Sequence, residues 1–258
     1  MGSFLKKGFG DKPNLPKKTF QNRLWIPAPP DGEKPDPKED ANNVIVLHQG
    51  EPVGFYEHQC KINNDWKNWF TCLSLNEIED RCPLCEHGEY RAYWAGAMTV
   101  LNTTPFNTKN GPNKGRRQLV IAKNEMLGRF ELWAQEDGDE AEDPRDLYGV
   151  EYRILRSSGD AANIGDDWKK RKLWTREELE EEFAEVMEQL AEQDWDGAEE
   201  EAENLLEMLP YEEIFAPKTI DELEAVCSVL GAPSKDKKRG RSSSSKGGHR
   251  SKKKGVSY

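Results

Sequence analysis

The stretch that decides the fold runs from residue 58 to residue 85 and reads HQCKINNDWKNWFTCLSLNEIEDRCPLC. It contains four of the five cysteines of the chain. The thiolates of Cys82 and Cys85 can bind one metal ion from a tight turn, and two upstream nitrogen or sulfur ligands then complete a tetrahedron. Cys72 is the predicted third ligand. The fourth is either His58 or Cys60, which point to the same side of a strand because they lie two residues apart.

Two other interpretations of these cysteines compete with a metal site. A Cys-x-x-Cys pair can be a redox dithiol, and free cysteines can simply be small buried hydrophobic residues. A redox pair is typical of a βαβ context and stands alone, whereas here further ligands lie just upstream. A catalytic zinc site leaves one position to water and needs a general base nearby. Because four protein ligands are available, the pattern favours one closed, structural zinc site.

The composition limits the class of protein. At 258 residues the chain could form one large domain or two small ones. Only 35% of the residues are hydrophobic and 33% are charged, so part of the chain is expected outside any core. The sequence has neither an 18-residue apolar run nor an apolar leader, which argues against a membrane span and a secretory signal. Cysteines clustered for metal binding fit a reducing cytoplasm.

The net charge of −11 is distributed unevenly along the chain. Residues 175–213 carry a net charge of −16, whereas residues 233–258 carry +9. Such asymmetry points to polyelectrolyte partners, or to one segment that competes for the site of another. We therefore expect four segments: a proline-rich extended arm at 1–43, a body at 44–174 with a metal subdomain at about 55–92, an acidic helical segment at 175–232, and a disordered basic tail at 233–258.

The body consists of short β patterns joined by long loops, without βαβ alternation. The predicted strands are 44–47, 53–60, 66–73, 93–101, 116–122 and 150–156. Asn124 is expected to cap a short helix that ends at Phe130. This mainly β pattern favours a small barrel, and the OB-fold, a five-stranded barrel that binds oligonucleotides, is the most economical choice.

Aromatic and basic residues alternate around the metal stretch and later in the body. Bases stack on aromatic faces with about 1–3 kcal/mol each, and cations neutralise phosphates. The residues predicted to stack with bases are Tyr56, Trp66 and Tyr93. Those expected in the core instead are Trp69, Phe70 and Trp94. The further predicted contacts of a nucleic acid strand are Lys109, Lys114, Arg116, Arg117, Trp168, Lys169, Lys170, Arg171 and Lys172.

The order of these motifs resembles one known family. His58, Cys72 and Cys82-Pro83-Leu84-Cys85, followed by Ala92-Tyr93-Trp94-Ala95, resemble the zinc-containing single-stranded-DNA-binding (helix-destabilising) proteins of tailed phages. The segment at 150–156 is similar to the last barrel strand of that family. The resemblance covers roughly residues 44–174, and the gap from His58 to Cys72 is one residue longer than in the family pattern.

The resemblance implies an OB-fold with an inserted zinc subdomain whose ligands are His58, Cys72, Cys82 and Cys85, so that His58 is favoured over Cys60. It also implies a protein that coats single-stranded DNA without sequence preference during phage replication, recombination and repair, in the cytoplasm of the bacterial host. An acidic C-terminal segment, here 175–213, would bind replication or recombination proteins and compete for the DNA groove. A basic N-terminal arm would support cooperative self-association. The basic tail at 233–258 departs from the family pattern.

The acidic segment also carries helix signals. Thr175 and Glu178 form a capping-box pattern, and apolar residues then recur at helical spacing. A second helix is expected from Asp196 and a third from Thr219 to Leu230. These helices either mimic a polyanion or form an ordinary solvated appendage.

The chain is not expected to be an enzyme, because no phosphate-binding loop, nucleophile elbow or zinc-protease motif is present. The alternative to DNA binding is a zinc-stabilised adaptor that binds proteins of phage transcription or replication.

Overall fold

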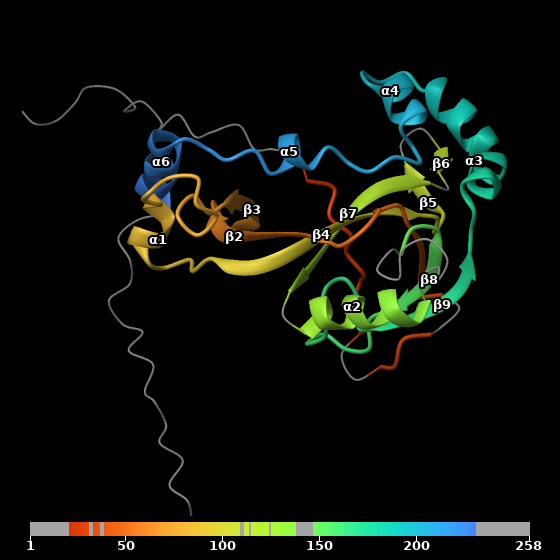
Figure 1. Ribbon diagram of the computed structural model, residues 1–258, viewed down its shortest axis with the longest axis horizontal. Helices are drawn as coiled ribbons and strands as arrows, with labels where there is room; N and C mark the ends of the chain where they lie inside the picture. Colours follow the sequence, from red (N-terminus) through yellow and green to blue (C-terminus); the bar gives the residue numbers. More distant parts are fainter. Residues whose placement is uncertain are drawn as a thin grey trace, which may run out of the picture.

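The computed structural model describes residues 21–30, 33–36, 39–108, 111–113, 115–123, 125–137 and 147–230 (Figure 1). Lys109, Lys114 and Asn124 lie outside the described residues, as do the first 20 residues and the basic tail at 233–258. None of the described helices is long and apolar enough to cross a membrane.

A seven-stranded antiparallel sheet forms the body of the protein, in the order β3-β2-β4-β1-β8-β9 with β7 on the other edge of β4. The strands are β1 (Asn42–Val46), β2 (Val53–Ile62), β3 (Asp65–Thr71), β4 (Tyr93–Asn102), β7 (Arg116–Lys123), β8 (Val150–Leu155) and β9 (Asp167–Leu173). Two further short strands, β5 (Phe106–Thr108) and β6 (Gly111–Asn113), pair with each other. The six predicted strands of the body therefore exist, and β9 was not predicted.

The sheet is open, so it does not form the closed five-stranded barrel that the sequence predicts. Strand β4 pairs with β2 and β1 at different points along one edge and with β7 along the other. No ladder among the described strands joins β7 to β9 or to β3. Because β1 and β2 share one edge of β4, the sheet branches, and the β2–β3 hairpin extends away from β8 and β9 (Figure 1).

One face of the sheet encloses the main core together with helix α2 (Glu125–Asp137). The helix was predicted to end at Phe130 but continues to Asp137. It continues because Trp133, like Phe130, packs on this core. Trp168, predicted to contact DNA, belongs to the same core and is only 6% exposed. It lies opposite Ile154 in the β8–β9 ladder, and alternation along β9 turns it inward. The prediction for Trp168 is therefore wrong.

Part of the predicted N-terminal arm belongs to this core. Residues 22–24 are extended, and the amide of Leu24 donates to the carbonyl of Leu119 in β7 over 2.7 Å. Leu24 and Ile26 are buried in the main core. Burial of an apolar side chain of this size contributes about 1.5–3 kcal/mol, so residues 22–26 stabilise the body although they precede residue 44.

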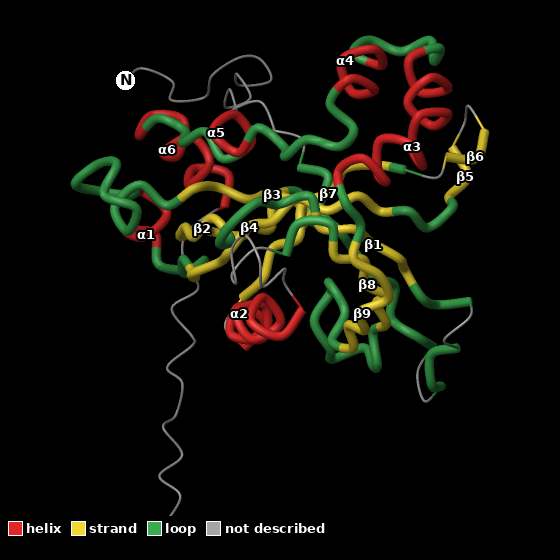
Figure 2. Tube along the Cα trace, turned by 45° about the vertical axis from the view of Figure 1, so that its right-hand side comes forward, coloured by secondary structure: helices red, strands yellow, loops and turns green. Residues whose placement is uncertain are grey.

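The acidic segment is folded onto the body of the protein, and its first helix packs on the second face of the sheet (Figures 1 and 2). Its helices are α3 (Arg176–Ala191), α4 (Ala198–Glu203), α5 (Tyr211–Ile214) and α6 (Ile220–Leu230). The predicted capping box is confirmed, since the Thr175 side chain and Glu178 exchange both hydrogen bonds. Leu179, Phe183 and Leu190 of α3 are buried against Ile45, Leu47 and Leu101. The segment is therefore part of the fold rather than a solvated appendage.

Candidate metal centre

Four side chains from three consecutive pieces of the chain converge beside the β2–β3 hairpin. His58 lies in the middle of β2, and Cys72 follows directly after β3. Cys82 is the N-cap of helix α1 (Pro83–His87), and Cys85 lies within it. Pro83 suits the first turn of a helix because its missing N–H would have no intrahelical partner there. The Cys82–Cys85 turn therefore directs both thiols toward His58 and Cys72.

The four ligand atoms have the spacing of a metal site. His58, Cys72, Cys82 and Cys85 each offer one ligand atom, and all four atoms lie within 4.8 Å of one another. The Nε2 atom of His58 is 3.5 Å from Cys82 Sγ and 3.6 Å from Cys85 Sγ. The sulfurs of Cys72 and Cys85 are 3.5 Å apart. A zinc tetrahedron with Zn–S of about 2.3 Å and Zn–N of about 2.0 Å has edges of about 3.5–3.8 Å, so the group could hold one metal ion.

The ring of His58 is held in the orientation that metal binding requires. Its Nδ1 donates to the backbone carbonyl of Tyr90 over 2.7 Å, and the side chain is completely buried. With the proton on Nδ1, the lone pair of Nε2 points toward the three sulfurs. Hydrogen bonding of the second ring nitrogen is the usual way in which proteins fix a ligating histidine.

Cys60 is not part of the group. It is fully buried two residues beyond His58, in the apolar cluster beneath the centre. Burial, followed by the neighbouring thiols of Cys227 and Cys82, raises the pKa of its thiol to about 12. Of the two candidates for the fourth ligand, the structure therefore places His58 in the group and Cys60 outside it.

The surroundings of the four side chains shift the pKa values of Cys82 and Cys85 in opposite directions. Burial by itself raises the pKa of the Cys82 thiol, but the neighbouring imidazole of His58 and the backbone amides of Cys85 and Leu73 lower it to about 6. The pKa of Cys85 is raised to about 12 by burial and by the thiols of Cys72 and Cys82. A bare group thus accommodates one thiolate readily and disfavours others nearby, whereas a bound cation would stabilise all three.

Helix α6 and the Asn76 side chain support the centre from two sides. Leu223 and Val226 of α6 are buried in the same apolar cluster as Cys72 and Leu84. The Asn76 amide bonds to both backbone groups of Tyr56 over 2.8 Å and to the Cys72 carbonyl over 2.7 Å. The final helix of the acidic segment therefore packs on the part of the chain that carries the four candidate ligands, residues 58–85, which we call the metal lobe. This contact was not predicted from the sequence.

The predicted stacking residues have different environments. Trp66 is 50% exposed and packs edge-on against Tyr90, with ring centroids 6.0 Å apart. Tyr56 is half-buried and packs edge-on against Trp94 at 4.8 Å. Trp94, which the sequence analysis assigns to the core, is 45% exposed and lies opposite Tyr56 in the β2–β4 ladder. The placement of Trp94 in the core was therefore wrong: its side chain lies on the same face of β4 as Met98, yet it stays 45% exposed.

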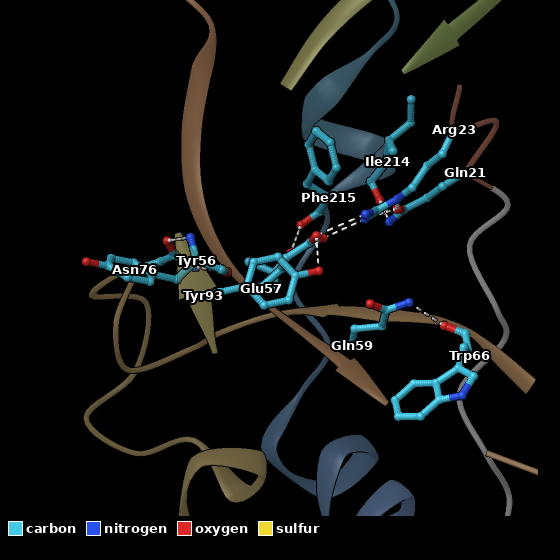
Figure 3. A network of polar contacts seen from close by, with 11 residues as sticks. Gln21, Arg23, Tyr56, Glu57, Gln59, Trp66, Asn76, Tyr93, Ile214 and Phe215 are labelled. Atoms are coloured by element: carbon cyan, nitrogen blue, oxygen red, sulfur yellow. Dashed lines mark hydrogen bonds and ion pairs between the residues drawn. The ribbon is translucent and has the colours of Figure 1, made fainter. Parts of the chain in front are cut away.

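Tyr93 points to the opposite face and is engaged in a buried polar network (Figure 3). Its hydroxyl donates to Glu57 over 2.6 Å, and the Arg23 guanidinium binds the same carboxylate. Burial and the charge of Glu57 raise the pKa of Tyr93. Lys123 covers its ring at 3.5 Å. The structure therefore leaves little of the Tyr93 ring for a base to stack on.

The predicted cations are divided between buried and exposed positions. Arg117 is buried and forms a bidentate ion pair with Glu201 of α4, with one bond of 2.6 Å. This acidic partner contradicts the prediction that Arg117 contacts DNA. Arg116 is half-buried, and burial lowers its pKa. Among the described residues, the exposed predicted cations lie on β9: Lys169, Lys170, Arg171 and Lys172.

The acidic partner of Arg117 and the exposure of Trp94 had no clear signal in the sequence, because both depend on how separate segments pack. Comparison of the chain with protein-family models, with curated proteins and with solved structures finds no match.

Proposed function

We propose that the four-ligand group binds one zinc ion in a closed structural site. Three sulfurs and one imidazole nitrogen are a donor set that zinc prefers, and four protein ligands leave no position for a catalytic water. The ion would join β2, the end of β3 and α1 into one rigid lobe. Its role would be to fix side chains around it rather than to react.

The proposed ligand of the zinc-stabilised face is single-stranded nucleic acid, most simply single-stranded DNA bound without strong sequence specificity. The observation that carries this proposal is the pair of half-exposed indoles, Trp94 and Trp66, each packed edge-on against a tyrosine. Strand register puts both indoles on the face that carries His58. Trp94 lies opposite Tyr56, two residues before His58. Trp66 lies two residues before Asn68, which is opposite Cys60, two residues after His58. Both indoles retain exposed surface on which bases could stack.

Cations accompany these rings. Lys61 lies 5.7 Å from the centre of the Trp66 ring. Farther along the sheet, the exposed β9 cations include Lys172, which covers Trp174 at 3.4 Å. Phosphates of a strand that passes over the aromatic face could pair with such side chains, and the affinity would then fall steeply with salt. This proposal agrees with what the resemblance to the phage family implies.

An electrophoretic mobility shift with poly-dT oligonucleotides of increasing length tests the proposal. We expect binding that strengthens with length, weakens with salt and persists when the base composition changes. Absence of binding at low salt would contradict it.

A protein-binding adaptor is the second candidate. The observation in its favour is the outer surface of α3, which exposes Glu177, Glu181, Glu185 and Glu188. A zinc-stabilised lobe with no affinity for oligonucleotides would favour this candidate over the first.

A further inference from the structure

A pocket of about 630 Å³ opens beside Trp94, on the face of the sheet that α2 covers. Its apolar wall includes Met98 and Phe130, and its polar lining includes Glu131 of α2. The volume lies within the range of about 300–1,000 Å³ that is typical of small-molecule sites. The pocket thus adjoins the aromatic face to which the proposed DNA strand binds.

Two glycines shape the pocket. Gly54 of β2 lies opposite Gly96 of β4, and both line the pocket. A Cβ atom on Gly54 would collide with the indole of Trp94, and one on Gly96 would collide with Leu127 of α2. The absence of both side chains therefore lets the indole of Trp94 and the side chain of Leu127 approach the sheet closely at the pocket. A pocket bordered by an indole and an aliphatic side chain suits a planar heterocycle.

The polar chemistry of the pocket is that of an acceptor. Among the described residues, no hydrogen bond or ion pair engages the carboxylate of Glu131, which is exposed on α2 at the pocket. A carboxylate accepts hydrogen bonds from the exocyclic amine of cytosine, whereas thymine presents the O4 acceptor at the same edge. A phosphate would be repelled, so the chemistry fits a base and not the backbone of the strand.

We propose that this pocket receives one nucleobase of the bound strand and that Glu131 makes it prefer cytosine to thymine. The inference rests on the proposed DNA binding and adds a modest base preference to it. Trp94 supplies the stacking surface, Gly54 and Gly96 let Trp94 and Leu127 pack closely on the sheet, and Glu131 accepts the hydrogen bond from the amine.

The test compares the affinities of fluorescein-labelled dC20 and dT20 for the full zinc-loaded chain, by anisotropy at pH 8 and fixed salt. The wild-type protein should bind dC20 about three- to tenfold more tightly than dT20, as one hydrogen bond of this kind predicts. Glu131→Gln should bring the ratio to about one, since an amide both donates and accepts. Because each ratio is taken within one variant, the general effect of the lost negative charge cancels.

Two further variants complete the design. Leu127→Trp, which fills the pocket, should also remove the preference, and Glu199→Gln on α4 is the charge-matched control that should retain the wild-type ratio. Equal affinities in the wild-type protein, or a preference that survives Glu131→Gln, would overturn the pocket assignment while DNA binding stands. No binding of either oligonucleotide would overturn both.

Discussion

The Nδ1 atom of His58 donates a 2.7 Å hydrogen bond to the backbone carbonyl of Tyr90. The ring of Tyr90 in turn packs against Trp66. Trp94 pairs with Tyr56 in the β2–β4 ladder, and the residue before it, Tyr93, points to the opposite face, where its hydroxyl binds Glu57. The exposed indoles of Trp94 and Trp66 therefore lie on one face of the sheet. An ion bound by His58 would therefore fix the segment that supports an exposed indole, and metal binding and ring placement are physically coupled.

Substitution of single cysteines should distinguish the predicted zinc ligand Cys72 from Cys60, a buried thiol outside the ligand group. Cys72→Ala should abolish binding of one zinc per chain, because three ligands leave the site open. Cys60→Ala, which removes an equally buried thiol outside the group, should retain it. Metal analysis of the purified variants by mass spectrometry measures both. Loss of zinc from Cys60→Ala together with its retention in Cys72→Ala would show that the ligand set is wrong.

The Asn76 side chain should contribute measurably to stability. Asn76→Ala removes three hydrogen bonds and leaves backbone groups of Tyr56 and Cys72 without these partners. The expected cost in the free energy of unfolding is about 1–3 kcal/mol, measured by urea denaturation of the zinc-loaded protein. Asn68→Ala, which removes one exposed bond to the Asp65 carbonyl, is the matched control and should cost less. Equal losses would argue against a supporting role for Asn76.

The exposed and buried tryptophans should respond in opposite ways. Trp94→Ala and Trp66→Ala should each weaken binding to single-stranded DNA by about 1–3 kcal/mol with little change in the melting temperature. Trp168→Ala should instead destabilise the fold by about 3–5 kcal/mol, because its ring is packed among Phe130, Trp133 and Tyr152. Parallel fluorescence titrations and thermal melts distinguish the two effects. Unchanged affinity in both exposed-tryptophan variants would contradict the proposed aromatic face.

Truncation should reveal that the acidic segment is structural. A chain that ends at Trp174 would expose the sheet residues under Leu179, Leu205 and Leu223, all fully buried. Each such side chain contributes about 1.5–3 kcal/mol, and a domain is stable by only about 5–15 kcal/mol, so this truncation should not fold. A chain that ends at Leu230 retains these contacts and should melt cooperatively near the full-length temperature. Circular dichroism of both truncations provides the measurement, and a folded chain that ends at Trp174 would contradict this role.

The local signals in the sequence were sufficient for the metal ligands and most strands. The Cys82–Cys85 turn, the alternation of side chains between the two faces of β2 and the Thr175 capping box all depend on residues close in sequence. Closure of the sheet could not be predicted, because it depends on which edge of β4 each strand joins. The exposures of Trp94 and Trp168 were predicted the wrong way round, since a tryptophan has the same hydrophobicity on either face of a strand. The pairing of Arg117 with Glu201 joins residues 84 positions apart, and composition alone assigned the arginine to DNA.

Binding of a labelled dT20 oligonucleotide before and after removal of the metal tests the central claim most directly. The zinc-loaded protein should bind tightly at low salt, and chelation should weaken binding while it loosens the metal lobe, because structural zinc binding is coupled to folding. Addition of one equivalent of zinc should restore the affinity. An affinity that is the same with and without the metal, or no affinity in either state, would contradict the account.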